Sequence, residues 1–244
     1  MADMPGMGSG RMLMVGPMPS VYAGGGGQAG APVFQGLGDH HHPISTKNPR
    51  TQLFFDQGIN LLFGFNHAEA IRSFREAARL DPDCAMCWWG IAEALGPNIN
   101  LPMPQDAVAP AWAALRKARA LEARASPKER AWIEALATRY SADPKADRHA
   151  LDEAYAGAMG DLWRAWPDDL DAGTFYAEAL MDTQPWDYWG KTASRPRATR
   201  WRSWRRWKAS SGATPTIRAR CISTSTRWRR RQRRSGPRRR RTGC

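Results

Sequence analysis

The chain has 244 residues, enough for one sizeable domain or two small ones, and its formal net charge is +13. The charge is uneven: residues 191–244 hold 20 of the 36 Lys and Arg and no acid, whereas residues 1–190 hold the other 16 and all 23 Asp and Glu, a net −7. No apolar run reaches the roughly 18–20 residues that a membrane-spanning helix needs. Four cysteines in a chain this long do not make a disulfide framework. The composition therefore argues against a membrane-spanning protein and a disulfide-stapled miniprotein, and for a mildly acidic body with a basic tail.

Residues 1–50 are rich in Gly, Pro and Met and lack apolar periodicity, which predicts a flexible leader. Arg11 precedes the apolar residues 12–15 in a faint outline of a signal peptide, but Gly16 and Pro17 cut the apolar stretch short. A disordered leader or a misplaced start codon explains this segment better than export does. The sequence leaves the compartment open between cytoplasmic and exported.

Apolar residues in the middle of the chain recur at spacings of three and four, which is typical of amphipathic helices. Two helices are predicted in residues 51–81, the second beginning after Asn66 and ending before Pro82. Ser126 and Glu129 form a predicted capping box at the start of another helix. Further helices are predicted at residues 84–95, 111–123, 126–140, 149–166 and 172–181. About seven helices in antiparallel pairs, with no strand, predict an all-α protein whose pairs stack as a helical solenoid.

The register of the first two helices resembles the tetratricopeptide repeat (TPR), whose period is 34 residues. With Gly58 at the small position of the repeat, nine residues fall on signature positions and are assigned structural roles: Phe54, Gly58, Leu61, Ala70, Phe74, Ala77 and Pro82, then Trp88 and Leu95 in the next repeat. The second repeat fits only with a longer loop at residues 96–104, and the later helix pairs are degenerate. The resemblance covers residues 51–182. It implies a short TPR-like solenoid, assigned to residues 51–190, that binds a protein or peptide partner.

The chain also resembles, more closely, a group of bacterial TPR proteins, many of them exported and of undefined activity. The phrases that carry this resemblance are Leu-Gly-x-His-His-x-Pro-Ile-Ser-Thr at 37–46, Phe-Asp-Gln-Gly at 55–58, Phe-Asn-His-Ala-Glu-Ala-Ile-Arg-Ser-Phe at 65–74, Asp-Pro-Asp-Cys-Ala-Met-Cys-Trp-Trp-Gly at 81–90, Gly-Pro-Asn-Ile-Asn at 96–100, Ala-Leu-Met-Asp at 179–182 and Pro-Trp-Asp-Tyr-Trp at 185–189. Such proteins usually continue with further helical repeats. A truncated array would expose an apolar end, so we expect self-association.

Residues 191–244 contain Arg, Trp, Ser, Thr and Pro without apolar periodicity, which predicts a disordered tail. A basic arm could bind nucleic acid, with Trp201, Trp204 and Trp207 stacking between arginines. Alternatively, the tail is read in a shifted frame. Codons allowed for residues 216–231, regrouped by one base, encode His-Pro-Gly-Ala-Leu-His-Leu-Tyr-Ile-His-Ala-Val-Glu-Ala-Ser, which resembles the continuation expected in the bacterial group. We favour the frameshift, under which the tail has no selected function.

Three adjacent histidines, His40, His41 and His42, and a C-x-x-C pair, Cys84 and Cys87, are the candidate metal or redox residues. Adjacent histidines do not easily reach one ion, which favours a polar loop leading into the first helix. The two cysteines would face the same way near the start of a helix, where the positive end of the helix dipole favours a thiolate. No second C-x-x-C completes a zinc site. Core packing is therefore favoured, with a disulfide at the helix start as an option in an exported protein.

Eight tryptophans in residues 88–189 could anchor a partner or fill the core. We expect Trp88 to lie in the core and Trp89 to be more exposed, which makes Trp89 the candidate partner contact. No nucleophile–base set, phosphate loop or nucleotide fingerprint is present in the sequence, and no cofactor is implied. The sequence thus predicts a non-catalytic scaffold that binds a protein or peptide. A metal- or redox-linked protein, and nucleic-acid binding through the tail, are the alternatives.

Overall fold

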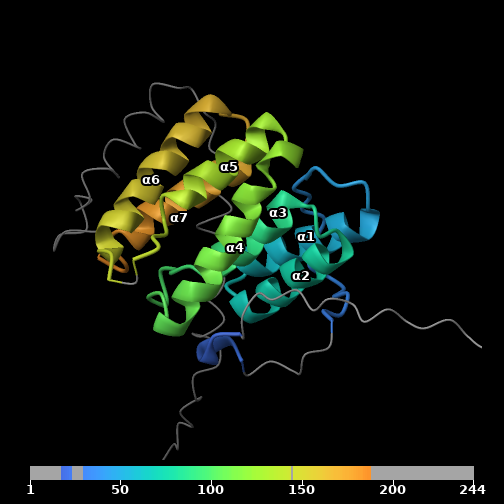
Figure 1. Cartoon of the computed structure of the whole chain (residues 1–244), viewed down its shortest axis with the longest axis horizontal. Helices are drawn as coiled ribbons and strands as arrows, with labels where there is room; N and C mark the ends of the chain where they lie inside the picture. Colours follow the sequence, from blue (N-terminus) through green and yellow to red (C-terminus); the bar gives the residue numbers. More distant parts are fainter. Residues whose placement is uncertain (1–17, 24–29, 144, 188–244) are drawn as a thin grey trace, which may run out of the picture. The chain divides into compact units, whose positions relative to one another are not determined.

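The computed structural model describes residues 18–23, 30–143 and 145–187 of the chain (Figure 1). Within these ranges the regular elements are helical and there is no strand, only an isolated bridge between Asn98 and Leu101. The helices are α1 (Pro49–Phe63), α2 (His67–Leu80), α3 (Ala85–Ala94), α4 (Val108–Ala120), α5 (Pro127–Ala137), α6 (Arg148–Ala165) and α7 (Leu170–Asp182), with three 3-10 turns, η1 (Ser20–Tyr22), η2 (Gln105–Ala107) and η3 (Glu122–Arg124). The prediction of an all-α protein is confirmed for the part of the chain described. The predicted tail, with Trp201, Trp204 and Trp207, lies outside it.

The chain divides into two compact units, residues 1–158 and 159–244. The boundary lies inside α6 and therefore inside the repeat domain predicted at residues 51–190. The described part of the first unit contains α1 to α5 and the start of α6, and that of the second contains the end of α6 and α7. Among the helices described, none has the length and apolar character needed to cross a membrane.

Local sequence sets where the helices begin. The predicted capping box is present at α5, since the Ser126 Oγ accepts from the Glu129 N–H at 3.2 Å and the Glu129 carboxylate accepts from the Ser126 N–H at 2.7 Å. Asn66 caps α2 as predicted, accepting from Glu69 N–H at 3.4 Å. α1 begins two residues earlier than predicted, because Asn48 caps it and proline occupies its first position.

α1, α2 and α3 pack closely around the ring of Phe74. α1 and α2 are joined by three residues and form an antiparallel pair, and α3 packs on both (Figure 1). Phe74 of α2 is fully buried between two glycines. A Cβ atom on Gly58 of α1 would come within 2.4 Å of this ring, and one on Gly90 of α3 within 2.5 Å. The three backbones therefore approach this closely only because neither glycine has a side chain.

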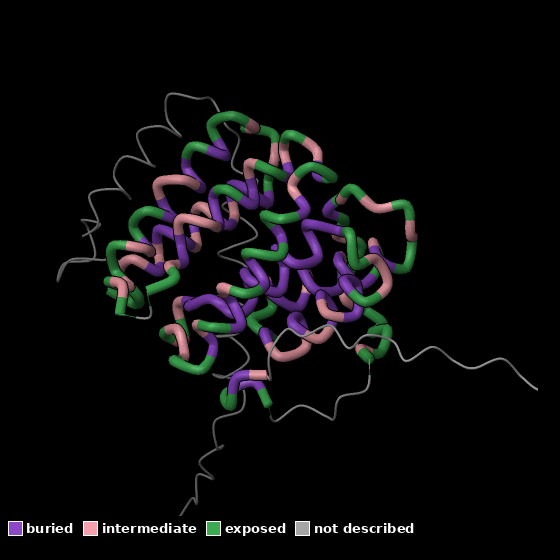
Figure 2. Tube along the Cα trace, viewed as in Figure 1, coloured by how far each residue is buried: buried purple, intermediate pink, exposed green. Residues whose placement is uncertain are grey.

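α3 lies in the interior of the first unit. All ten of its residues are buried, and Figure 2 shows this helix as a nearly continuous buried stretch. α4 packs against α3, and α5 packs against both α3 and α4. The first helices of the successive pairs, α1, α3 and α5, are thus in contact one after the other.

The residues assigned to repeat positions lie in the interior of the first unit, with one exception. The buried ones are Phe54, Gly58, Leu61, Ala70, Phe74, Ala77, Trp88 and Leu95. Pro82 is exposed in the turn after α2, where it bounds the helix instead of packing in the core. The buried positions therefore act through packing between helices.

In the second unit, Trp163 on α6 packs against α7. Its ring lies 6.0 Å from the ring of Tyr176, and a Cβ atom on Gly173 would come within 2.9 Å of it. Two large apolar side chains near the ends of α7 stay exposed, Leu170 at 50% and Trp186 at 63%. Exposed apolar side chains such as these could contact a second copy of the chain. Self-association therefore stays a prediction.

Candidate functional site

A segment of the predicted leader is held against the helices of the first unit. We call residues 30–48 the N-terminal strap; it contains no helix or strand. Near its beginning, the Gln57 side chain of α1 accepts from the Phe34 N–H at 2.8 Å and donates to the Pro32 carbonyl at 2.9 Å. This part of the predicted leader therefore lies against α1, where a helix side chain binds its main chain.

After a turn that contains two glycines with positive φ, the strap runs back along α1 in the antiparallel direction. Three side chains spaced four residues apart on α1 bind main-chain groups spaced two residues apart on the strap: Asn60 donates to the His40 carbonyl at 3.4 Å, Asp56 accepts from the His42 N–H at 2.9 Å, and Gln52 accepts from the Ile44 N–H at 3.0 Å. Two extended residues span about 6.6 Å and four helical residues about 6 Å. These two spacings are nearly equal, so successive turns of α1 bind successive alternate residues of the strap.

The three histidines proposed as metal ligands have three different partners. The Nδ1 of His41 lies 2.8 Å from the Asp56 carboxylate, and its side chain is largely exposed. The His40 ring meets Phe63 at 5.7 Å, while His42 is buried. In the part of the chain that the structure describes, no group of three or more His, Cys, Asp or Glu is placed to hold a metal ion. The structure does not bring the histidines together around one point.

His42, the strap's one buried residue, fills a slot between aromatic rings. Its ring lies 5.7 Å from Phe55 of α1 and 5.4 Å from Trp132 of α5, which it meets nearly at a right angle. Trp132 in turn meets Trp89 of α3 at 5.2 Å. Edge-to-face ring pairs at such distances are favourable. The His42 ring therefore joins the strap to an aromatic cluster from α1, α3 and α5.

The expectation that Trp89 is the more exposed of two adjacent tryptophans is wrong. Trp89 has no exposed surface, whereas Trp88 retains 4%. The reason is that α3 is covered by neighbouring helices around its whole circumference, so a position on its far side is as buried as one on its near side. Trp89 therefore offers a partner no surface. Its ring packs against Trp132, which in turn contacts His42.

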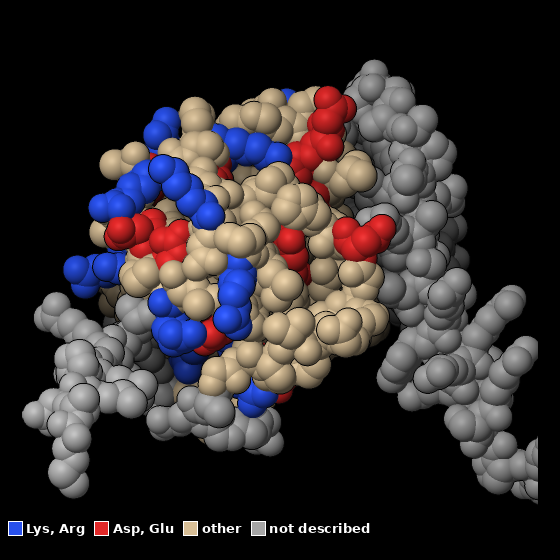
Figure 3. Space-filling model, turned by 90° about the vertical axis from the view of Figure 1, so that its right-hand side faces the viewer, with Lys and Arg blue, Asp and Glu red and all other residues tan. Residues whose placement is uncertain are grey.

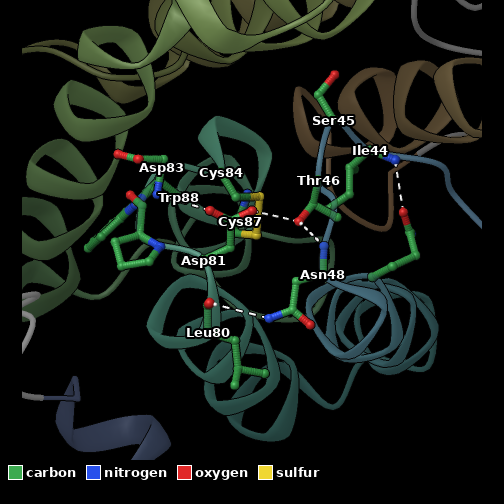
Figure 4. Close-up of a disulfide and its surroundings, with 12 residues drawn as sticks. Ile44, Ser45, Thr46, Asn48, Leu80, Asp81, Asp83, Cys84, Cys87 and Trp88 are labelled. Carbon is green, nitrogen blue, oxygen red and sulfur yellow. Dashed lines mark hydrogen bonds between the residues drawn. A yellow bond between two sulfur atoms is a disulfide. The ribbon is translucent and has the colours of Figure 1, made fainter.

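Beyond its buried histidine, the strap contacts the helices through hydroxyl groups. The Glu129 carboxylate on α5 accepts from the Ser45 N–H at 2.6 Å and also from the Ser45 hydroxyl. The Thr46 hydroxyl donates to Asp81, just after α2, at 2.5 Å (Figure 4). Hydrogen bonds to an ionised acceptor are stronger than those between neutral groups. The two carboxylates thus fix the strap between the start of α5 and the end of α2.

Cys84 and Cys87 form a disulfide at the start of α3, with their Cα atoms 5.4 Å apart (Figure 4). Cys84 is also the cap residue, since its sulfur accepts from the Cys87 N–H at 3.1 Å. Both residues are buried. The pair therefore packs in the core, as favoured from the sequence, and also forms the helix-start disulfide that the sequence left as an option. Its sulfur atoms are bonded to each other and not arranged with the three histidines.

The first unit also buries an ion cluster that sequence reasoning missed. Arg139 donates to Glu93 at 2.9 Å and to the Pro97 carbonyl at 2.8 Å, with the Asp152 carboxylate 4.0 Å from its Nε. The Tyr155 hydroxyl donates to Glu93 at 3.2 Å. Burial raises the pKa of Glu93, opposed by the charge of Arg139 and the bond from Tyr155. The signal that could have revealed the cluster is Glu93 itself, a lone charge in an otherwise apolar helix.

His67, at the start of α2, is a second buried polar group. Its Nε2 accepts from the Asn98 amide at 3.3 Å, and its ring stacks on Tyr22 at 6.0 Å. Burial lowers the pKa of His67 from 6.5 to about 4, opposed by a hydrogen bond with the Phe65 backbone and assisted by the charge of Arg139. His67 is therefore neutral near pH 7 and attaches the loop after α3 and the turn at η1 to α2.

The surface of the described residues carries charges of both signs. Figure 3 shows Lys and Arg interspersed with Asp and Glu on one face, with broad uncharged areas between them. The excess positive charge of the chain comes from residues 191–244, which the structure does not describe. Nucleic-acid binding through the tail therefore stays a prediction about those residues.

No protein-family model matches the chain, and no curated protein or solved structure matches it. The candidate site is accordingly defined by the chain's own contacts. Side chains of α1 and α5 bind the main chain of the strap, an aromatic slot holds its one buried ring, and two carboxylates accept its hydroxyl groups. This face of the first unit is a site at which an extended polypeptide is held.

Proposed function

We propose that this chain is a protein- or peptide-binding scaffold of the helical-repeat kind, similar to the tetratricopeptide repeat. One observation carries the proposal: side chains of α1 and α5 hold an extended segment chiefly through its main chain. Main-chain N–H and C=O groups are the same in every peptide. The same side chains are therefore suited to an extended segment of another sequence.

The arrangement of the helices supports the same function. In a solenoid of helix pairs, the first helices of successive pairs line one face, which extended ligands use. α1 and α5 are such first helices here and contact the strap directly, while α3 joins them in the interior. The burial of the repeat-register residues, such as Phe74 against Gly58, is consistent with stacking of this kind.

The chemistry at this face supports binding in preference to catalysis. Gln52 and Asp56 bind the strap and each other, with a Gln52-to-Asp56 hydrogen bond of 2.9 Å. Glu129 is committed to Ser45 and to the cap of its own helix. Gln52, Asp56 and Glu129 are thus each engaged with main-chain groups of the strap, as a peptide-binding surface requires.

A screen of the purified full chain against an array of synthetic dodecapeptides tests the function. It uses the wild type and His42→Ala, which removes the strap's one buried side chain. Array peptides that carry an amine-reactive end group should label Lys47 in the strap or Lys128 at the start of α5, and spare Lys117 on α4, the control. Retention of no peptide by either form, or labelling confined to Lys117, would contradict the proposed function.

A further inference from the structure

The strap is attached to the first unit mainly by polar contacts: those of its main chain and those of the Ser45 and Thr46 hydroxyl groups. Residues 43 and 45 on either side of Ile44 are exposed, Ile44 is half-buried, and only His42 is buried. Apolar burial contributes in proportion to the area removed from water. The strap therefore gains little from the hydrophobic effect apart from the His42 ring, and polar contacts account for most of its attachment.

Removal of residues 30–46 from the face does not require α1 to unfold. α1 begins at Pro49 and carries its own cap in Asn48, whose side chain accepts from the Arg50 N–H at 3.0 Å. Lys47, the residue before the cap, is exposed. The segment that precedes Lys47 can swing away while the capped helix, and the face it contributes, stay in place.

We propose, resting on the function above, that residues 40–46 are a displaceable ligand held in cis, and that an external extended peptide of the same chemistry takes their place. That chemistry is a planar ring, followed two residues later by an aliphatic residue and then by two hydroxyl-bearing residues. In the strap these are His42, Ile44, Ser45 and Thr46.

The face itself dictates this preference. The slot beside Phe55 and Trp132 admits a flat ring that is tilted against Phe55 and in edge-to-face contact with Trp132. The Glu129 and Asp81 carboxylates need hydrogen-bond donors, which Ser and Thr supply. An acidic residue or a phosphorylated hydroxyl at these two places would set like charges against each other. The external peptide is therefore neutral or basic where it meets the two carboxylates.

The tethered strap lowers the apparent affinity of any such peptide. A segment joined to its site by a short linker competes at an effective concentration in the millimolar range. The apparent affinity of an external peptide equals its intrinsic affinity multiplied by the fraction of molecules whose face is free of the strap. A variant that weakens the strap without touching the helices should bind the peptide more tightly than the wild type does.

The test uses the full chain and a fluorescent synthetic peptide that has the sequence of residues 37–48. Fluorescence anisotropy should give His42→Ala an apparent affinity at least tenfold higher than that of the wild type. Lys47→Ala removes an exposed side chain just outside the segment, and it should stay within twofold of the wild type. A second peptide with Asp at the places of Ser45 and Thr46 should bind His42→Ala at least tenfold more weakly. If His42→Ala does not fold, the double variant Ser45→Asp with Thr46→Asp takes its place. Its new carboxylates would repel Glu129 and Asp81 and so release the strap.

Equal affinities of the wild type and His42→Ala for the peptide would overturn the inference, as would equal binding of the acidic peptide. Dimerisation of His42→Ala in place of peptide binding would assign the face to a second copy and overturn it too. The proposed function fails separately, when neither form retains any peptide of the array. If both forms retain array peptides equally well, the function stands and the displaceable strap does not.

Discussion

Ser45 and Glu129 are 84 residues apart in the sequence, and the Glu129 carboxylate accepts both the N–H and the hydroxyl of Ser45. The same carboxylate closes the capping box of α5 by accepting the Ser126 N–H at 2.7 Å. One side chain thus fixes both the start of a helix and the end of the strap. The two roles can be separated by substitution.

Glu129→Ala removes both roles, and we expect a loss of about 2 kcal/mol in the free energy of unfolding. The strap should also be released, so trypsin should cleave after the exposed Lys47 faster than in the wild type. Ser126→Ala removes only the cap and should cost about 1 kcal/mol while Lys47 stays protected. Equal rates of cleavage at Lys47 in the two variants, measured by mass spectrometry, would show that Glu129 does not hold the strap.

Gly58→Ala tests the close approach of α1 and α2. Its Cβ atom would meet the Phe74 ring at 2.4 Å, so the helices must separate. Overpacking of this kind costs about 1–3 kcal/mol, which urea unfolding followed by tryptophan fluorescence can measure. Gly64→Ala is the control, because its Cβ atom would have ordinary contacts at 3.4 Å and its φ is −82°. Similar stability of the two variants would contradict the packing described.

Arg139→Leu tests the buried ion cluster. The substitution leaves Glu93 buried without its cation, and breaking a buried pair in this way costs about 3–5 kcal/mol. Arg119→Leu breaks the pair between Arg119 and Glu134, both about half exposed, and should cost at most about 1 kcal/mol. Arg139→Leu combined with Glu93→Leu should recover part of the loss. Chemical denaturation of the three variants measures their free energies of unfolding. A loss of stability for Arg139→Leu no larger than that for Arg119→Leu would refute the stabilising role of the cluster.

The pKa of His67 predicts how stability depends on pH. The pKa is about 4 in the folded protein and 6.5 as a model value, so between these pH values the unfolded chain binds more protons. Stability should therefore be complete above pH 6.5 and fall as the pH falls towards 4. The contribution lost between pH 7 and pH 4.5 is roughly 2–3 kcal/mol. His67→Gln should lack this contribution, and an identical pH dependence in the variant and the wild type would contradict the assignment.

The helices were predictable from sequence because their signals are local. The Ser126–Glu129 capping box and the proline after α2 each act within four residues, and both mark helix boundaries in the structure. Asn48 precedes a proline at the first helical position, but a composition-based leader over residues 1–50 hides this capping signal. The Gly- and Pro-rich composition of residues 1–50 is an average over the segment, so it does not reveal a single capping residue at its end.

The strap and the aromatic slot were not predictable for the opposite reason. The contacts of Ser45 with Glu129 and of His42 with Trp132 join residues far apart in the sequence and leave no periodic pattern. The exposure of Trp89 was misjudged because helical periodicity tells one face of α3 from the other only when one face meets solvent. In α3 both faces meet other helices.

Hydrogen exchange of the strap amides tests the central claim most directly. In the free protein the N–H groups of His42, Ile44 and Ser45 are bound by Asp56, Gln52 and Glu129, so they should exchange slowly. With the full chain saturated by a peptide selected on the array, these three amides should exchange at the rates of a free segment while those of α3 stay protected. Peptide binding that leaves the three strap amides protected would contradict the account, because the peptide would then occupy a different surface.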